Sequence, residues 1–379
     1  MKGREKMKRF LAFMGVLFVV SVIGYLQPVF FPAEKPKQVA DSGMRDVSHT
    51  ALPYEEIATS GFAEYIGKKT DNFINQFGEP IEKQKTGMGY DLWIYGERDA
   101  DYFEINVQDE KVSAIKAFNN SKEVIPFSIG MNLSDVSEQM TIFSNFTFTY
   151  KENDYSIELM EEDMNYRPLI AFDNKTFAIL FFDHADGRLS AITYLNKESL
   201  LTLMPYQMVE GEALPILMTE AQSGFDPVKS NQAIRTINLL RSKEDLPTYS
   251  ANTESQRNAQ KLFDTLVKNE KTILSSERAE IWQFSKEQAT SQAIFTLTNS
   301  EYQKLLKAGQ LNKRDATGMY TEPVYDATFT ILSWFSDSLY HSRFAHDETE
   351  NIGVAFSNAS MLVLLQESES EISQTEESE

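Results

Sequence analysis

The chain has 379 residues and a formal net charge of −20, with 56 acidic against 36 basic residues. This excess of negative charge disfavours nucleic acid binding, because surfaces that bind phosphate depend on Lys and Arg. The chain has no cysteine, which excludes disulfides, thiolate nucleophiles and thiolate metal sites. Hydrophobic residues make up 42% of the chain, enough for packed cores, and the length predicts two domains.

A basic stretch over residues 1–9 precedes an apolar segment at the N-terminus. Residues 10–26 contain no charged side chain, and 17 residues are near the lower limit for crossing a bilayer. We predict a transmembrane signal anchor over residues 10–31 with its basic end in the cytoplasm. The protein would then be a single-pass protein of the cell membrane, with the bulk of the chain extracellular. A cleaved signal peptide is the alternative, although the residues after Gly24 form a poor cleavage site.

Two polar segments flank the region predicted to fold. Residues 32–60 mix Pro, Ser, Lys and Asp without periodicity, which predicts a linker. Residues 367–379 hold six Glu and no basic residue. Such a composition buries too little apolar surface to fold, so we predict an acidic disordered tail.

Residues 61–212 contain an internal repeat. The first copy opens with IGKKTD at 66–71 and the second with IGMNLSD at 129–135. Their closing hairpins also match, with QDEKVSAI at 108–115 and HADGRLSAI at 184–192. Asp-Glu and Asp-Gly between apolar runs indicate tight turns. Each copy predicts a helix followed by an antiparallel meander, and we expect the copies to bury each other's apolar faces.

Three residues of the second hairpin raise the question of a metal site. Asp183, His184 and Asp186 are all potential ligands. However, the turn itself selects Asp-Gly, and no oxygen-rich loop with calcium-binding spacing follows. We therefore interpret these residues as part of the turn.

Residues 228–366 have helical periodicity and then end in a hairpin. An apolar stripe at spacing i, i+3, i+4, i+7 and i+8 runs over residues 259–267, and similar patterns cover 233–240, 302–306 and 327–335. Residues 351–356 and 361–365 are apolar runs separated by a short polar turn. Helices around a small sheet predict an α+β fold.

The C-terminal sequences resemble those of a known superfamily. Residues 335–341 read FSDSLYH and residues 351–356 read NIGVAF, similar to the W-x-N-S-x-x-H-R and G-V-G-V-A motifs of bacterial CAP domains. These SCP-like extracellular domains form the superfamily of cysteine-rich secretory proteins, antigen 5 and pathogenesis-related proteins. INLLR at 237–241 is similar to the family's L-x-N-x-x-R. The resemblance implies an α-β-α sandwich over residues 228–366.

The repeated region resembles the CAP-associated N-terminal domain of Bacillus, Listeria and enterococcal membrane proteins. YIGK at 65–68, GYDLWIY at 89–95 and RPLI at 167–170 carry this resemblance. It implies a cell-envelope protein of a Gram-positive bacterium.

The family's metal groove, with two His and two acidic residues, is incomplete in this chain. His341 is in register with one of the histidines, whereas Glu322 is displaced from the position of the family's acid. Trp334 neighbours the position of the family's Trp. We expect a degenerate binding groove that contains His341, Ser338, Glu322 and Trp334.

His341 is also the candidate catalytic residue, as a general base, and a weak metal candidate together with His346. A third interpretation is a structural histidine that caps its helix. A groove with a single His cannot supply a zinc site, which normally takes three protein ligands. We therefore expect no cofactor and assign no catalytic residue.

The expected function is non-catalytic binding or scaffolding in the cell envelope. Its partner would be a cell-wall or envelope component, or a lipid, with the membrane contacted through the N-terminal helix. Two alternatives remain open: a metal-dependent hydrolase acting on peptide or cell-wall material, and a lipid-binding CAP protein.

Overall fold

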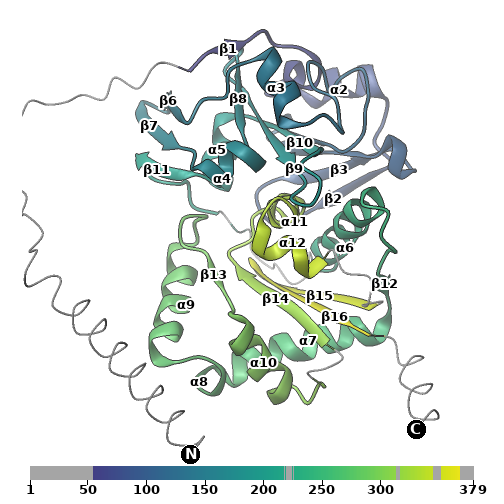
Figure 1. Ribbon diagram of the computed structural model, residues 1–379, viewed down its shortest axis with the longest axis vertical. Coiled ribbons are helices and arrows are strands. Elements are labelled where there is room, and N and C mark those ends of the chain that lie inside the picture. The colour runs from purple at the N-terminus through teal and green to yellow at the C-terminus, as the bar shows by residue number, and fades with distance from the viewer. Residues whose placement is uncertain are drawn as a thin grey trace, which may run out of the picture. The chain divides into compact units, whose positions relative to one another are not determined.

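The computed structural model describes residues 54–367 apart from 217, 219–223, 225, 313–315 and 345–350 (Figure 1). The described residues belong to one compact unit. The basic end, the anchor predicted over 10–31, most of the linker and the tail beyond Glu367 lie outside them. Within the described residues, no helix combines the length and apolar character that crossing a bilayer requires.

The N-terminal half is built on an eight-stranded sheet with the order β1-β8-β9-β10-β5-β4-β3-β2. A second sheet with the order β11-β7-β6 packs on one face of it. The strands are β1 (Glu56–Ile57), β2 (Glu82–Lys85), β3 (Asp91–Tyr95), β4 (Phe103–Gln108), β5 (Lys111–Ala117), β6 (Asn145–Tyr150), β7 (Asn153–Glu158), β8 (Leu169–Phe172), β9 (Phe177–Phe182), β10 (Leu189–Leu195) and β11 (Gln207–Glu210). The helices are η1 (Gly61–Tyr65), α2 (Thr70–Phe77), η2 (Asp99–Asp101), α3 (Leu133–Gln139), α4 (Glu161–Tyr166) and α5 (Lys197–Leu203).

The internal repeat is visible in the backbone hydrogen bonds. In the first copy the Gly67 N–H donates to the carbonyl of Val112 (2.8 Å). In the second copy the Gly130 N–H donates to the carbonyl of Leu189 at the same distance. Each opening loop thus docks on the last strand of its own meander before its helix begins.

The two copies meet edge to edge, which differs from the expected face-to-face packing. β5 pairs with β10 in antiparallel register, with Lys116 opposite Thr193. Both closing strands have a free edge within their own copy, and pairing them satisfies the backbone groups of both. The sheet then has two apolar faces. One is covered by η1, α2 and α3, and the other faces the small sheet and the C-terminal half.

The folded body begins earlier than the linker prediction placed it. β1 pairs in parallel with β8, with Glu56 opposite Ala171. Lys175 Nζ lies 2.5 Å from Glu56 Oε2. The end of the segment predicted as linker is therefore the edge strand of the sheet.

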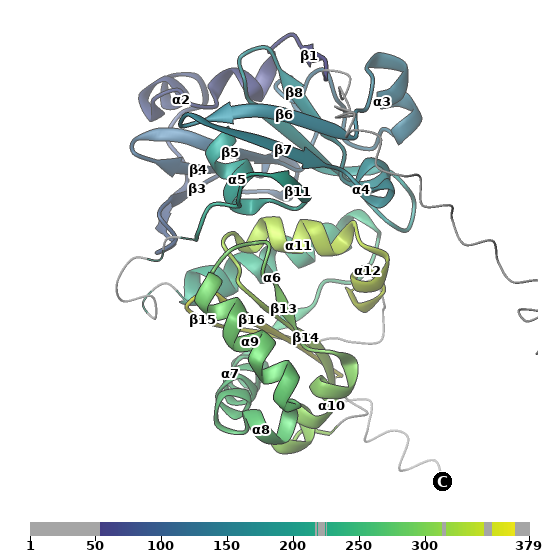
Figure 2. The ribbon, with the colours of Figure 1, turned by 90° about the vertical axis from the view of Figure 1, so that its left-hand side faces the viewer.

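The C-terminal half is an α-β-α sandwich, as expected (Figure 2). Its sheet has the order β12-β15-β16-β14-β13. Helices α6 and α11 pack on the face toward the N-terminal half, while α7 and α10 cover the other face. The elements are α6 (Asp226–Lys243), β12 (Ser250–Ala251), α7 (Thr253–Lys268), α8 (Glu270–Ile273), α9 (Ser276–Gln288), β13 (Phe295–Thr296), α10 (Asn299–Ala308), β14 (Ala316–Glu322), α11 (Ala327–Phe335), α12 (Ser338–Phe344), β15 (Asn351–Ser357) and β16 (Ser360–Gln366).

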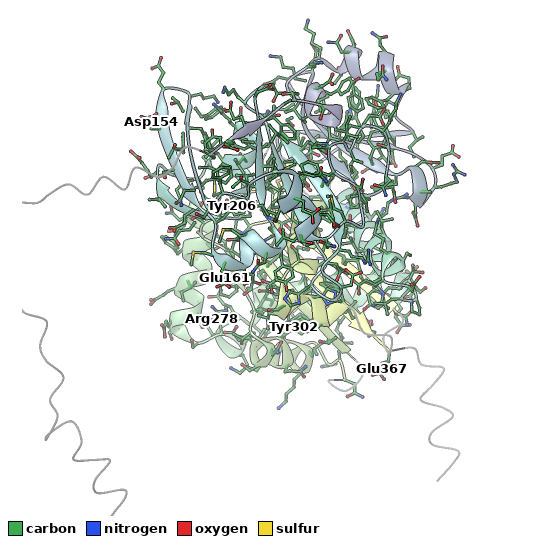
Figure 3. The ribbon with its side chains drawn as sticks, turned by 45° about the horizontal axis from the view of Figure 1, so that its top comes forward. Asp154, Glu161, Tyr206, Arg278, Tyr302 and Glu367 are labelled. Atoms are coloured by element: carbon green, nitrogen blue, oxygen red, sulfur yellow. The ribbon has the colours of Figure 1, made fainter. Side chains whose placement is uncertain are left out.

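Buried tyrosines anchor elements within each half (Figure 3). The Tyr206 hydroxyl donates to the carbonyl of Arg167 (2.7 Å), and the Tyr302 hydroxyl donates to the carbonyl of Val363 (2.8 Å). A buried hydroxyl without such a partner would cost stability. These bonds therefore fix the segments that the tyrosines reach.

Candidate functional site

His341 joins the two halves of the fold through two carboxylates. Its Nε2 atom lies 3.1 Å from Glu244 Oε1 and 3.3 Å from Asp183 Oδ1. His341 lies on α12, Glu244 directly follows α6, and Asp183 directly follows β9 of the N-terminal half. Figure 1 labels these three elements. The cluster therefore depends on three elements from both halves.

The hairpin turn holds the Asp183 carboxylate in place. Asp183 Oδ1 accepts a hydrogen bond from the Ala185 N–H (2.6 Å), and the Asp183 N–H donates to the Arg188 carbonyl (2.8 Å). Gly187 has φ +68°, a left-handed conformation that favours glycine. The Asp-Gly turn recognised in the sequence thus also positions a carboxylate toward the C-terminal half.

Aromatic rings surround the His341 imidazole. The Phe335 ring meets it edge-on at 5.8 Å between centroids, and the His184 ring lies at 6.4 Å. His184 in turn stacks on Tyr166 at 4.4 Å. The cluster is thereby shielded, and the His341 and Asp183 side chains are each 9% exposed.

The cluster shifts the pKa of each of its three members. Burial lowers the pKa of His341, but its hydrogen bonds to Asp183 and Glu244 outweigh burial and raise it to about 9. Burial raises the pKa of Asp183, yet hydrogen bonds from its neighbours leave it below the usual range. The pKa of Glu244 is raised, chiefly by burial and also by the neighbouring Asp183. At neutral pH the imidazole is therefore protonated when no other cation is bound.

The four residues of the expected groove do not converge on one site. Ser338 is exposed at the start of α12. Glu322 is buried within the C-terminal half, where it accepts hydrogen bonds from Trp282 and Tyr320 (both 2.7 Å). Trp334 lines a cleft described below, which His341 does not line. His346 lies outside the described residues.

Among the residues that the structure describes, none forms a nucleophile–base pair with His341. Both groups within hydrogen-bond distance of Nε2 are carboxylates. The hydroxyl of the nearby Ser336 donates instead to the Leu332 carbonyl (3.0 Å). A general base would need a hydroxyl or water within reach of this nitrogen.

A cleft of about 430 Å³ lies where the two halves meet. Its C-terminal wall includes four aromatic side chains among polar and aliphatic ones, and Arg167 and Met204 contribute from the N-terminal half. The Arg167 guanidinium is already paired with Asp163, at 2.8 Å. The hydroxyl oxygens of Ser291 and Ser333 are buried in this lining and have no hydrogen-bond partner among the described residues. The aromatic lining residues are Tyr325, Phe329, Trp334 and Tyr340.

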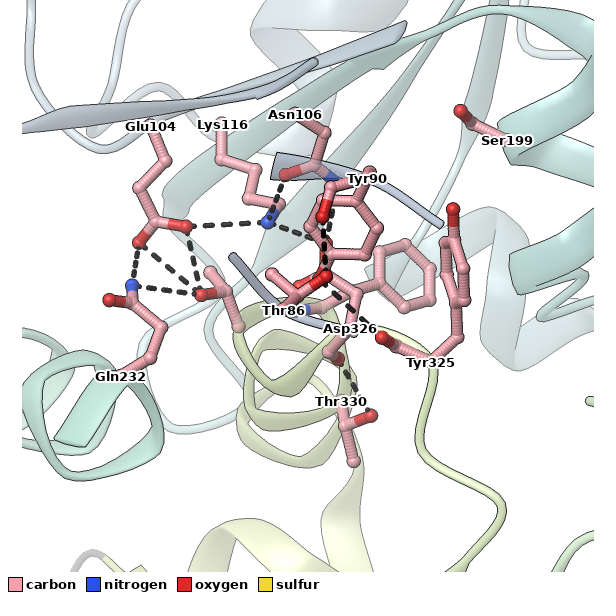
Figure 4. Close-up of polar contacts among 12 residues, drawn as sticks. Thr86, Tyr90, Glu104, Asn106, Lys116, Ser199, Gln232, Tyr325, Asp326 and Thr330 are labelled. Carbon is pink, nitrogen blue, oxygen red and sulfur yellow. Dashed lines mark hydrogen bonds and ion pairs between the residues drawn. The ribbon is translucent and has the colours of Figure 1, made fainter. Parts of the chain in front are cut away.

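A buried ion network fixes the two halves together (Figure 4). Lys116 Nζ lies 2.5 Å from Asp326 Oδ2 and 3.3 Å from Glu104 Oε2, and all three side chains are at most 1% exposed. The Thr328 hydroxyl donates to Glu104 Oε2 (2.9 Å), and the Gln232 amide donates to Glu104 Oε1. Burial raises the pKa of Glu104. The network connects β4 and β5 with α6 and α11.

The sequence indicated Asp183 and His341 separately but did not connect them, and it missed Glu244. One signal was available. Glu244 directly follows α6, and a negative charge at a helix C-terminus is opposed by the helix dipole. An acid at such a position indicates a compensating partner elsewhere in the fold.

The chain combines a CAP-associated N-terminal domain with a C-terminal half of the SCP/CAP fold. Residues 66–206 match the family model described as CAP-associated N-terminal. An extracellular protein containing an SCP domain, from Bacillus anthracis Ames, has a TM-score of 0.63 at 19% identity, covering 83% of this chain and 97% of its own. A cysteine-rich secretory protein from Staphylococcus aureus Mu50 has a TM-score of 0.65 at 16% identity, covering 84% and 99%.

A curated relative extends the comparison to sequence. The Bacillus subtilis 168 protein described as uncharacterized membrane protein YlbC is 26% identical over 249 residues, 63% of this chain and 70% of the relative. The resemblance expected from the sequence motifs is therefore confirmed.

Proposed function

We propose that this protein is anchored in the cell membrane by residues 10–31 and binds an envelope component outside the cell without catalysing a reaction. The cleft between the halves carries this proposal. Its volume of about 430 Å³ is within the range of small-molecule and peptide sites. The location is supported by the descriptions of the relatives, one as a membrane protein and one as extracellular.

The lining of the cleft favours an amphipathic ligand. Aromatic side chains offer apolar contact area, while the hydroxyls of Ser291 and Ser333, which have no hydrogen-bond partner in the described part of the chain, favour a polar group on the ligand. The Arg167 charge is neutralised by Asp163, so no described residue of the lining offers a free cation to a strongly anionic ligand. A cell-wall peptide, a lipid and an apolar segment of another envelope protein all have this chemistry.

Cross-linking of intact cells with a membrane-impermeant reagent tests both location and binding. Ile294 lines the cleft and is 56% exposed, so Ile294→Glu places a charge in it without disturbing a core. Ile81, at 52% exposure and away from the cleft, provides the matched control Ile81→Glu. We expect recovery of the cross-linked partner to fall about tenfold in Ile294→Glu, equivalent to about 1.4 kcal/mol of binding free energy, and to stay unchanged in the control.

Two results would contradict the proposal. An absence of cross-linking until the cells are lysed would place the folded part in the cytoplasm. Equal recovery of partners by Ile294→Glu and the wild type would exclude the cleft as the binding site.

A further inference from the structure

We propose that Asp183, Glu244 and His341 bind one divalent transition-metal ion that bridges the two halves of the fold. Each side chain offers one ligand atom, and the three atoms lie within 4.8 Å of one another. Across the described ranges, this is the one group of at least three His and carboxylate side chains that converges so closely.

The balance of donors and acceptors in the cluster favours a cation. A single nitrogen, Nε2 of His341, lies within 3.3 Å of two carboxylate oxygens. This nitrogen carries at most one proton, so it cannot donate a full hydrogen bond to both. Two neighbouring carboxylates repel each other unless positive charge lies between them, and either a protonated His341 or a metal ion supplies that charge. A metal ion would accept a lone pair from all three atoms at once.

Two of the three separations between ligand atoms suit a small metal ion. Ligand atoms at 2.0–2.1 Å from a tetrahedral zinc ion are separated by about 3.3 Å. The separations of 3.1 and 3.3 Å between Nε2 and the two oxygens fit that spacing. Three protein ligands would leave a fourth position for water or another ligand.

The donor set indicates the class of metal. One imidazole with two carboxylates suits Zn²⁺ or a similar transition metal, whereas Ca²⁺ and Mg²⁺ prefer six or more oxygen ligands. His184 adjoins Asp183, but its ring centroid lies 6.4 Å from that of His341 and it is outside the group whose ligand atoms converge, so it becomes a fourth ligand only if its side chain moves closer. Stacking on Tyr166 holds this second imidazole nearby.

This site is distinct from the proposed binding cleft. None of its three ligands lines the cleft. The metal would instead connect the turn after β9 with α6 and α12, and so stabilise the contact between the halves by mass action. Binding of an envelope component does not depend on it, so the two proposals can fail independently.

Calorimetric titration of the full-length chain tests the metal site. The protein, without a histidine tag and in mild detergent, is stripped with EDTA, dialysed, and titrated with ZnCl₂ in excess MgCl₂. We expect one zinc ion per chain and a higher melting temperature with zinc. Asp183→Asn, Glu244→Gln and His341→Gln should each weaken zinc binding at least about tenfold. The matched control is Asp186→Asn in the same turn, whose exposed carboxylate lies outside the cluster.

Further measurements separate loss of a ligand from loss of fold. Circular dichroism checks each variant, and the visible absorption of cobalt(II) bound to the wild type reports the number of ligands. His184→Gln should change the cobalt spectrum if His184 is the fourth ligand. The proposal is wrong if the wild type binds no zinc under these conditions. It is also wrong if folded Asp183→Asn and His341→Gln bind zinc as the control does.

Discussion

Replacing Lys116 by Met removes the cation from the buried network between the halves. Two carboxylates depend on that cation, with Asp326 Oδ2 at 2.5 Å and Glu104 Oε2 at 3.3 Å from Nζ. The Lys116 ammonium group also donates a hydrogen bond to Asn106 Oδ1 at 3.1 Å. Met fills a similar volume, so the change tests charge more than packing.

The expected loss of folding free energy is about 3–5 kcal/mol at neutral pH, the usual cost of leaving a buried charge without its partner. Combining Lys116→Met with Glu104→Gln and Asp326→Asn removes the unpaired charges. This triple variant should therefore be more stable than the single variant. The exposed pair Lys85–Asp91 gives the control, because Lys85 is 72% exposed and Lys85→Met should cost at most about 1 kcal/mol.

Urea unfolding of the full-length chain in detergent, followed by tryptophan fluorescence, measures these losses. The pKa of Glu104 is already raised in the folded protein, so the folded state binds more protons than the unfolded state above the ordinary pKa of Glu. The difference in free energy of unfolding between the wild type and Lys116→Met should therefore become smaller as the pH falls toward the ordinary pKa range of a carboxyl group. A loss below about 1 kcal/mol, or a triple variant less stable than the single one, would refute the reasoning.

Two further predictions concern the same boundary and the C-terminal sheet. The first is measured in EDTA, so that no metal is bound. The pKa of His341 is raised from an ordinary 6.5 to about 9, so its ion pairs stabilise the fold fully below pH 6.5. That contribution, at most about 3 kcal/mol, is lost as the pH rises through 9, so the melting temperatures of wild type and His341→Gln should converge at high pH. The second is Gly353→Ala, which would place a Cβ against the Ser255 carbonyl and 3.0 Å from the Ala259 Cβ. The substitution should lower the free energy of unfolding by about 1–3 kcal/mol. An unchanged midpoint of urea unfolding would contradict that packing.

Local sequence patterns predicted most of the elements. The turn residues at 108–111 and 184–188 delimit β4, β5, β9 and β10, and the apolar stripe over 259–267 lies within α7. These features depend on neighbours in the chain, so their residues alone determine them. The same holds for β15 and β16, which the sequence predicted as a hairpin.

Long-range pairing could not be predicted in the same way. A lysine is rarely fully buried unless it is paired, so the sequence of β5 alone would place Lys116 in water. Instead Lys116 is buried, because Asp326 at the N-terminus of α11 pairs with it. The contact of Asp183 with His341 depends likewise on how the halves dock. Neither local propensity nor spacing in one chain contains that information.

One apolar face of the large sheet in the N-terminal half is covered by the small sheet and by the C-terminal half. Deleting either half would therefore expose a large hydrophobic surface on the other. The remaining half would tend to aggregate or be degraded. Truncated versions of this protein would then report on solubility more than on recognition. Single-residue changes at the boundary are the safer genetic approach for separating what each half contributes in the cell.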